Sequence, residues 1–212
     1  MITSIIIRSD VTITSQDTLY EVKRGSQSTN NFENLSYGIS TQYGNISFVD
    51  TRDMYFKKLA ELDLLHNIRL ELFIDNNIIG TYMANDNWNY NVYNNTINVS
   101  LGSFNLLRLQ NMVIKDSIIK DGEYFDKPAE NTHVYKENTS AYKIFNDIII
   151  KNTQKYMTFD ISDVKTYMQS ITIGFPYFKT GNLWEQLNKL CELCLLKVYE
   201  LPDGTIKVSK GN

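Results

Sequence analysis

The fold is decided by the stretch Asn182-Leu-Trp-Glu-Gln-Leu-Asn-Lys-Leu-Cys-Glu-Leu-Cys194, which runs directly into Leu195-Leu-Lys-Val-Tyr-Glu-Leu201, Pro202-Asp-Gly204 and Thr205-Ile-Lys-Val-Ser209. Apolar residues in the first part recur at helical spacing, which predicts a short amphipathic helix. The two later runs alternate apolar and polar residues around a Pro-Asp-Gly turn, which predicts a β-hairpin. A helix that leads into a hairpin is a packing unit rather than a reaction centre.

Strand patterns at short intervals precede this unit. Residues 68–74 and 78–83 alternate around the turn Asp75–Asn77, and Asn tolerates the positive φ that such turns require. Residues 88–93 and 96–101 alternate in the same way around Asn94 and Asn95. We expect these four strands to form an antiparallel meander that closes into a small barrel or sandwich. Further strands are expected within 2–14 and at Ile46–Phe48, ending near Asp50 after a turn flanked by Gly38 and Gly44.

Helical spacing and polar segments complete the predicted organisation. Helices are expected at 51–65 and at 140–150, the second capped by Ser140, while 104–119 is ambiguous and 171–178 is extended. Residues 121–139 are polar and contain Pro128, which is typical of a linker or exposed loop. The predicted fold is therefore α+β and mainly β. It comprises a barrel or sandwich at 1–120, a linker at 121–139, and an α+β subdomain at 140–212 ending in a helix and a hairpin.

Composition narrows the class of protein. The chain has 212 residues, of which 42% are hydrophobic and 21% charged, as expected for a globular protein able to bury its own core. The net charge is −3 and no block of Lys or Arg occurs, so we expect no sequence-specific nucleic-acid partner. The N-terminus does not resemble a signal peptide, and no apolar run is long enough to span a membrane.

The two cysteines, Cys191 and Cys194, offer little chemistry. They share one helix face, where a disulfide is geometrically poor, and they fall in the later turns rather than at a helix N-terminus that would stabilise a thiolate. His66 follows an apolar segment and His133 is expected in a loop, both too distant in sequence to complete a zinc site. We expect both cysteines to be buried apolar residues, with no metal and no cofactor.

Other catalytic patterns are weak. The acidic residues Asp50, Asp53, Glu61 and Asp63 could supply a carboxylate pair for glycoside hydrolysis, but a strand end and a solvated helix face explain them equally well. The turns at 75–77 and 85–87 carry oxygen ligands but lack the spacing of a calcium loop. Neither a Gly-x-Ser-x-Gly elbow nor a glycine-rich phosphate loop occurs. We expect no enzymatic activity.

The aromatic residues Trp88, Tyr90 and Tyr93 are the candidate binding residues. Their rings could stack on sugars or serve a protein interface, because aromatic side chains bury a large area and keep a polar tip. Period-two spacing on one strand favours a core position for Trp88. Helical spacing likewise favours a core position for Trp184, Leu187 and Cys191.

The order of these units resembles the N-terminal part of the tail-hub proteins (tail-tip or baseplate hub) of phages that infect low-GC Gram-positive bacteria. The resemblance lies in 35–50, the hairpin 68–79, and the run Gly181-Asn-Leu-Trp-Glu-Gln-Leu followed by Tyr199-Glu-Leu-Pro-Asp-Gly-Thr-Ile-Lys-Val208. In that family a helix, a strand, Asp-Gly and a second strand end a small α+β domain that follows a β-barrel. Family members often continue with further domains, and this sequence ends just after the hairpin.

The resemblance implies a structural virion protein of a phage tail, assembled in the host cytoplasm. It further implies a homo-oligomer, in this family commonly a threefold ring, with other tail proteins as partners and no membrane anchor. The alternative is a β-rich module that recognises a surface glycan through Trp88, Tyr90 and Tyr93. A carboxylate-based glycan hydrolase is a third and weaker hypothesis.

Overall fold

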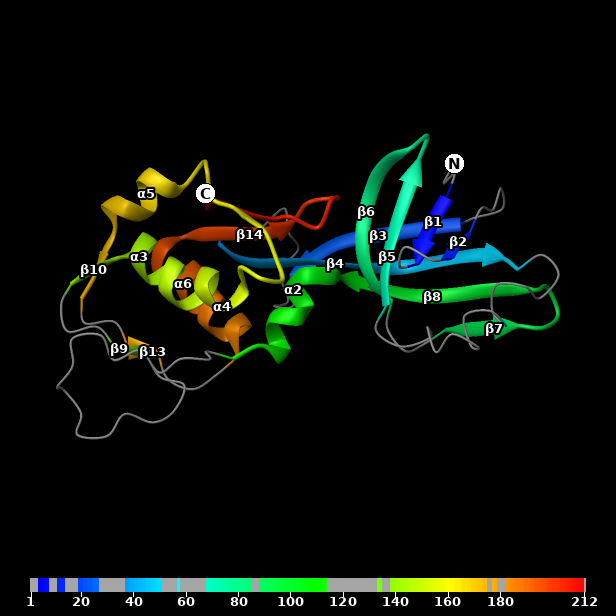
Figure 1. Cartoon of the computed structure of the whole chain (residues 1–212), viewed down its shortest axis with the longest axis horizontal. Coiled ribbons are helices and arrows are strands. Elements are labelled where there is room, and N and C mark those ends of the chain that lie inside the picture. Colours follow the sequence, from blue (N-terminus) through cyan, green and yellow to red (C-terminus); the bar gives the residue numbers. More distant parts are fainter. Residues whose placement is uncertain are drawn as a thin grey trace. The chain divides into compact units, whose positions relative to one another are not determined.

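A computed structural model of the chain describes residues 4–7, 11–13, 19–26, 37–50, 57, 68–84, 88–113, 133–134, 138–174, 177–178 and 182–211. The chain divides into two compact units (Figure 1). Unit 1 comprises Met1–Gly25, Thr41–Phe104 and Glu200–Gly204, and unit 2 comprises Ser26–Ser40, Asn105–Tyr199 and Thr205–Asn212. The expected linker at 121–139 falls almost wholly outside the described residues, so the division into 1–120 and 140–212 stays a prediction.

Unit 1 is a curled half-barrel sheet (Figure 1). Its strands hydrogen-bond in the order β4-β8-β6-β5-β1-β2, while β3 pairs with β4 and β7 pairs with β8. The strands are β1 (Ser4–Ile7), β2 (Val11–Ile13), β3 (Leu19–Ser26), β4 (Gly38–Val49), β5 (Ile68–Ile74), β6 (Asn77–Ala84), β7 (Asn89–Asn91) and β8 (Thr96–Ser103). The described strands thus leave the sheet open, and the expected closed barrel or sandwich is replaced by a half-barrel.

The β5–β6 hairpin confirms the prediction from sequence. Asp75 and Asn76 have φ angles of 48° and 66°, and Ile74 pairs with Asn77 across them. Two positive φ angles make a two-residue turn whose twist matches that of the flanking strands, and short Asx residues tolerate this conformation. The oxygen-rich turn is therefore explained by backbone geometry.

The order of the last strands in unit 1 differs from the expected meander. β6 pairs directly with β8, through Tyr82 opposite Ser103 and Ala84 opposite Leu101. β7 pairs with the other end of β8, through Asn89 opposite Asn98. β8 has eight residues, so the edge that faces away from β4 has room for β7 at residues 96–98 and for β6 at residues 101–103. Sequence spacing could not reveal this division.

β4 also differs from the prediction. Gly38 and Gly44 lie within one twelve-residue strand rather than at a turn before it. Residues Gly38–Ser40 pair in parallel with β14 in unit 2, and Tyr43–Val49 pair antiparallel with β8 in unit 1. The parallel pairing makes the sheet mixed, a feature that alternating patterns do not signal.

The core of unit 1 follows strand alternation. On β8, Ile97, Val99 and Leu101 are buried, whereas Asn98 is exposed. The other buried apolar side chains of the unit are Ile46, Phe48, Leu70, Leu72, Tyr82 and Ala84. Burying one face of each strand fixes its register, because a slip by one residue would expose every core side chain.

Unit 2 consists of short helices and a few strands. Its strands hydrogen-bond in the order β11-β15-β14-β4, with β11 parallel to β15. The elements are α2 (Phe104–Arg108), the 3₁₀ helix Leu109–Asn111, β9 (His133–Val134), β10 (Thr139–Ser140), α3 (Ala141–Phe145), the π-helical turn Asn146–Ile150, α4 (Lys151–Thr153), β11 (Phe159–Asp160), α5 (Lys165–Ser170), β12 (Thr172–Ile173), β13 (Tyr177–Phe178), α6 (Leu183–Cys194), β14 (Leu196–Glu200) and β15 (Ile206–Lys210). His133, expected in a loop, belongs to β9, which pairs with β13.

The helix expected at 140–150 is confirmed and extends to Thr153 with a π-helical turn in its middle. The Ser140 hydroxyl accepts a hydrogen bond from the backbone N–H of Lys143 at 3.3 Å, as an N-cap should. Phe145 is fully buried, and its ring meets that of Phe159 edge to face at 5.6 Å between centroids. The aromatic pair lies in the hydrophobic core that the helices of unit 2 share with β11, β14 and β15.

The C-terminal helix and hairpin are confirmed nearly residue by residue. The Asn182 side chain accepts a hydrogen bond from the Glu185 N–H at 2.9 Å and caps α6. Gly204, in the turn between β14 and β15, has a φ of 86°, which favours glycine. Leu187 and Cys191 are buried as expected, while Trp184 is half-buried against the core. The predicted packing unit is therefore present.

Leu195 ends α6 in a left-handed conformation, with φ and ψ both 50°, and its side chain is 47% exposed. Such a conformation costs an L-residue roughly 1 kcal/mol that glycine avoids. We therefore expect Leu195→Gly to raise the free energy of unfolding by up to about 1 kcal/mol. Leu193→Gly is the matched control: Leu193 is similarly exposed but lies inside α6, so we expect a loss of about 1 kcal/mol. Urea unfolding of both variants checks the prediction, which fails if the two changes have the same sign.

Candidate functional site

The three candidate aromatic residues lie on or beside the β7–β8 hairpin of unit 1. Trp88 precedes β7 and is half-buried, with no hydrogen-bond partner for its inaccessible indole N–H in the part of the chain that the structure describes. Tyr90 is half-buried, and its hydroxyl donates to the Asn95 side-chain oxygen at 3.2 Å. Tyr93 lies in the turn and is fully exposed, at 101%. The strand expected at 88–93 thus spans only Asn89–Asn91.

These positions do not make one stacking platform. Tyr90 lies directly opposite Ile97, so its ring extends the core side of the hairpin. Tyr93 instead projects from the turn beside Val92, which is 73% exposed. The Tyr93 N–H donates to the Asn91 side-chain oxygen at 3.0 Å, which helps to fix the turn. The hairpin tip, Val92 and Tyr93, is therefore an exposed apolar surface on a short, hydrogen-bonded turn.

The opposite side of this hairpin was not singled out from the sequence. Outward-facing residues of β4, β7 and β8 form a sheet surface of amides and hydroxyls, here called the amide face. Its members are Asn45, Ser47, Asn89, Asn91, Thr96, Asn98 and Ser100. The polar alternation within each strand was visible in the sequence, but only the strand register shows that the three rows join.

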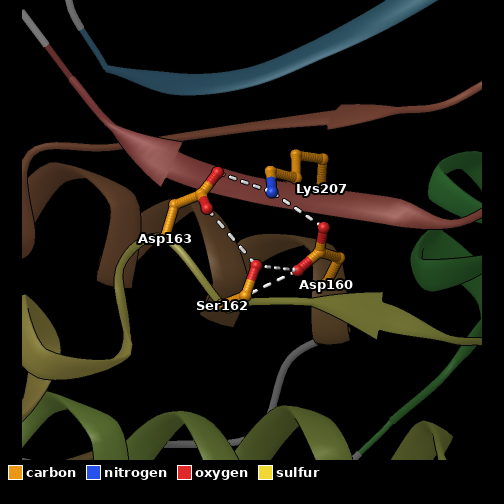
Figure 2. Close-up of polar contacts among 4 residues, drawn as sticks. All are labelled: Asp160, Ser162, Asp163 and Lys207. Atoms are coloured by element: carbon orange, nitrogen blue, oxygen red, sulfur yellow. Dashed lines mark hydrogen bonds and ion pairs between the residues drawn. The ribbon is translucent and has the colours of Figure 1, made fainter.

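A second polar arrangement joins β11 to β15 in unit 2 (Figure 2). The Lys207 ammonium lies between two carboxylates, 2.7 Å from Asp160 Oδ2 and 2.6 Å from Asp163 Oδ2. The Ser162 hydroxyl donates to Asp160 Oδ1 at 2.6 Å, and the Ser162 N–H donates to the same oxygen at 3.0 Å. Since Asp160 and Lys207 are register partners on adjacent parallel strands, this cluster links the two strands.

The charges in this cluster are fixed at neutral pH. Hydrogen bonds from Lys207 and then Ser162 hold the pKa of Asp160 well below its usual value. The bond to Asp160, followed by that to Asp163, raises the pKa of Lys207 above its usual value. A general base must instead titrate near the working pH, so Lys207 is poorly suited to activate the Ser162 hydroxyl. The arrangement supports a structural role.

The lowered pKa of Asp160 predicts acid sensitivity. Its interactions stabilise the folded chain above the ordinary aspartate pKa of 3.8, and this contribution is lost as the pH falls further. We expect the urea midpoint of unit 2 to fall between about pH 5 and about pH 2.5, and to fall less steeply in Asp160→Asn. Trp184 fluorescence in a Trp88→Phe background reports this unit. Equal slopes in the two proteins would contradict the prediction.

The two cysteines are free and buried, as expected. Burial raises the pKa of the Cys191 thiol well above its usual value, and it raises that of Cys194 to about 11. Both thiols are consequently protonated at neutral pH, which is the form that packs as a small apolar group.

The remaining candidate residues are the acidic residues, His66 and the second oxygen-rich turn. Asp50 is buried at the end of β4, whereas Asp53, Glu61, Asp63, His66 and residues 85–87 lie outside the described residues. Within the described ranges, no three His, Cys, Asp or Glu side chains gather as a metal site requires. None of the helices that the structure describes is long and apolar enough to cross a membrane.

No family model and no curated protein matches the sequence. Among solved structures, the fold is similar to the crystal structure of the prophage MuSo2 43 kDa tail protein from Shewanella oneidensis, with a TM-score of 0.54 and 11% sequence identity. The match covers 98% of this chain and 55% of the tail protein, so this chain spans about half of that protein's length. The similarity concerns the fold, which resembles that of a phage tail protein.

Proposed function

We propose that this chain is a structural component of a bacteriophage tail, placed at the tail hub, tail tip or baseplate. The observation that carries the proposal is the fold similarity to a prophage tail protein over 98% of the chain. The proposed role is assembly with other tail proteins and with copies of itself in the virion, without catalysis. The fixed charges of the Asp160–Lys207 cluster agree with a structural protein.

The hairpin tip is the surface that we propose for assembly. Val92 and Tyr93 are the two most exposed large apolar side chains among the described residues. No charged residue occurs from Trp88 to Leu107, so the hairpin itself carries no charge that burial of the tip would desolvate. A projecting apolar tip that enters a different surface of a neighbouring subunit makes a heterologous contact, and such contacts can close into rings.

Mass photometry and negative-stain microscopy of the full chain test this proposal, with the chain alone and co-expressed with the tail proteins encoded beside its gene. We expect ring-shaped oligomers in at least one of these samples. The double variant Val92→Ser/Tyr93→Ser should lose them, while Tyr156→Ser, at another exposed tyrosine, should retain them. A monomer in every mixture would overturn the proposed function. Intact rings in the double variant would overturn only the assignment of the tip.

A further inference from the structure

We propose that the amide face binds a neutral polysaccharide through its amide and hydroxyl groups. The proposal is independent of the tail function, since it rests only on the register, exposure and chemistry of three strands in unit 1. It also replaces the aromatic trio as the candidate glycan site, because Tyr90 faces the core side of the hairpin.

Strand register brings the polar side chains together in rows. Ser47 lies opposite Asn98 on one side, and Asn98 lies opposite Asn89 on the other, so one row crosses three strands. In the next row, the Ser100 hydroxyl donates to the Asn45 side-chain oxygen at 3.3 Å. Asn45, Asn89 and Asn98 are all exposed. Their amide groups are therefore available both to donate and to accept hydrogen bonds.

The absence of charged residues from β4, β7 and β8 restricts the class of ligand that the amide face can bind. Residues 35–49 and 88–107 contain no Asp, Glu, Lys or Arg, so none of β4, β7 and β8 contributes a charged side chain to the face. Nucleic acids and other polyanions bind mainly through Lys and Arg, which β4, β7 and β8 do not offer. A ligand with hydroxyls and no charge matches it best.

Apolar residues are few on this side of the sheet: the half-buried Val49 lies opposite Thr96, and Tyr43 lies at the other end of the face. This small apolar share argues against a stable protein partner. Interfaces between proteins have an apolar core, and unpaired amides are costly to bury there. A saccharide supplies hydroxyls that pair with amides in both directions. Tyr43 follows the same side of β4 as Asn45 and is 52% exposed, so its ring can pack on the apolar side of a sugar at one end of the face.

The dimensions also suit a saccharide chain. From Tyr43 to Ser47 the strand rises by roughly 13 Å, and three strands span roughly 10 Å across. The amide face is thus wide enough for a short run of sugar rings. The site lies on strands that pack against a buried core. Because these strands are already ordered, binding should cost little conformational entropy of the backbone.

Binding of the full chain to an array of neutral hexose and N-acetylhexosamine oligosaccharides tests the proposal, with heparin and polygalacturonate as anionic probes. We expect at least one neutral oligosaccharide to bind, and calorimetry to give its affinity. The double variant Asn89→Ala/Asn98→Ala should bind that oligosaccharide at least about tenfold more weakly. Gln169→Ala removes an exposed amide from α5 in unit 2 and should bind normally.

A second variant separates binding from folding. Asn98→Val places a good strand former at an exposed strand position, so it should keep the melting temperature and still lose binding. The proposal is overturned if no neutral oligosaccharide binds, if only the anionic probes bind, or if folded variants bind like the parent. It is also overturned if these substitutions change only the oligomeric mass, because the face would then be a protein interface.

Discussion

Ile97→Asp is expected to unfold unit 1. Ile97 is fully buried in the middle of β8, where the core face of the sheet surrounds it. An aspartate there would have to bury a carboxylate without a partner, at a cost of at least about 4 kcal/mol. That cost is a large part of the total stability of a typical domain. Trp88 fluorescence in a Trp184→Phe background would show a lost or strongly shifted urea transition.

Asn98→Asp is the matched control for this prediction. Asn98 is the next residue on the same strand, but its side chain is exposed on the amide face. The same charge placed there should change the free energy of unfolding by less than about 0.5 kcal/mol. If Ile97→Asp and Asn98→Asp destabilise unit 1 equally, the register of β8 against β4 is wrong.

Phe145→Ala carries the second-largest expected effect. The Phe145 ring is fully buried in α3 and meets Phe159 of β11 edge to face, at an interplanar angle of 83°. Its removal leaves a cavity and ends the aromatic contact, so we expect the free energy of unfolding of unit 2 to fall by about 3–5 kcal/mol. Trp184 fluorescence in a Trp88→Phe background follows the urea transition of this unit.

Tyr156→Ala tests whether the loss reflects burial rather than the mere removal of a ring. Tyr156 lies in the same unit, in the turn after α4, and is about half exposed. We expect its replacement to cost less than about 1 kcal/mol. A loss comparable with that of Phe145→Ala would show that the core of unit 2 is placed incorrectly.

Local signals predicted the elements whose residues interact with near neighbours in the chain. The Ser140 cap, the β5–β6 turn at Asp75 and Asn76, and the final hairpin were all expected. Each of these features depends on contacts between residues a few positions apart. The residue types at those positions are therefore enough to predict the local conformation. The two weakest predictions, the turn near Gly38 and the strand at 88–93, concern segments whose ends are set by distant partners.

Among the candidate sites, too, local features were predicted from the sequence and long-range contacts were not. Burial of Cys191 and Cys194 followed from helical spacing, whereas the Asp160–Lys207 cluster joins residues 47 positions apart and left no pattern in the sequence. The aromatic residues were visible, but the side of the hairpin on which each lies was not. Opposite strand faces become distinguishable only once Tyr90 is known to lie opposite Ile97.

The sequence by itself determined the mainly β class, the helix caps, the tight turns and the C-terminal helix and hairpin, because these depend on the intrinsic preferences of neighbouring residues. Only the tertiary structure decided that β4 pairs in parallel with β14, that β8 serves both β6 and β7, and that three polar strand faces join into the amide face. Pairing between distant strands is selected by the burial of a shared core, and many registers satisfy the same alternation until that core is assembled.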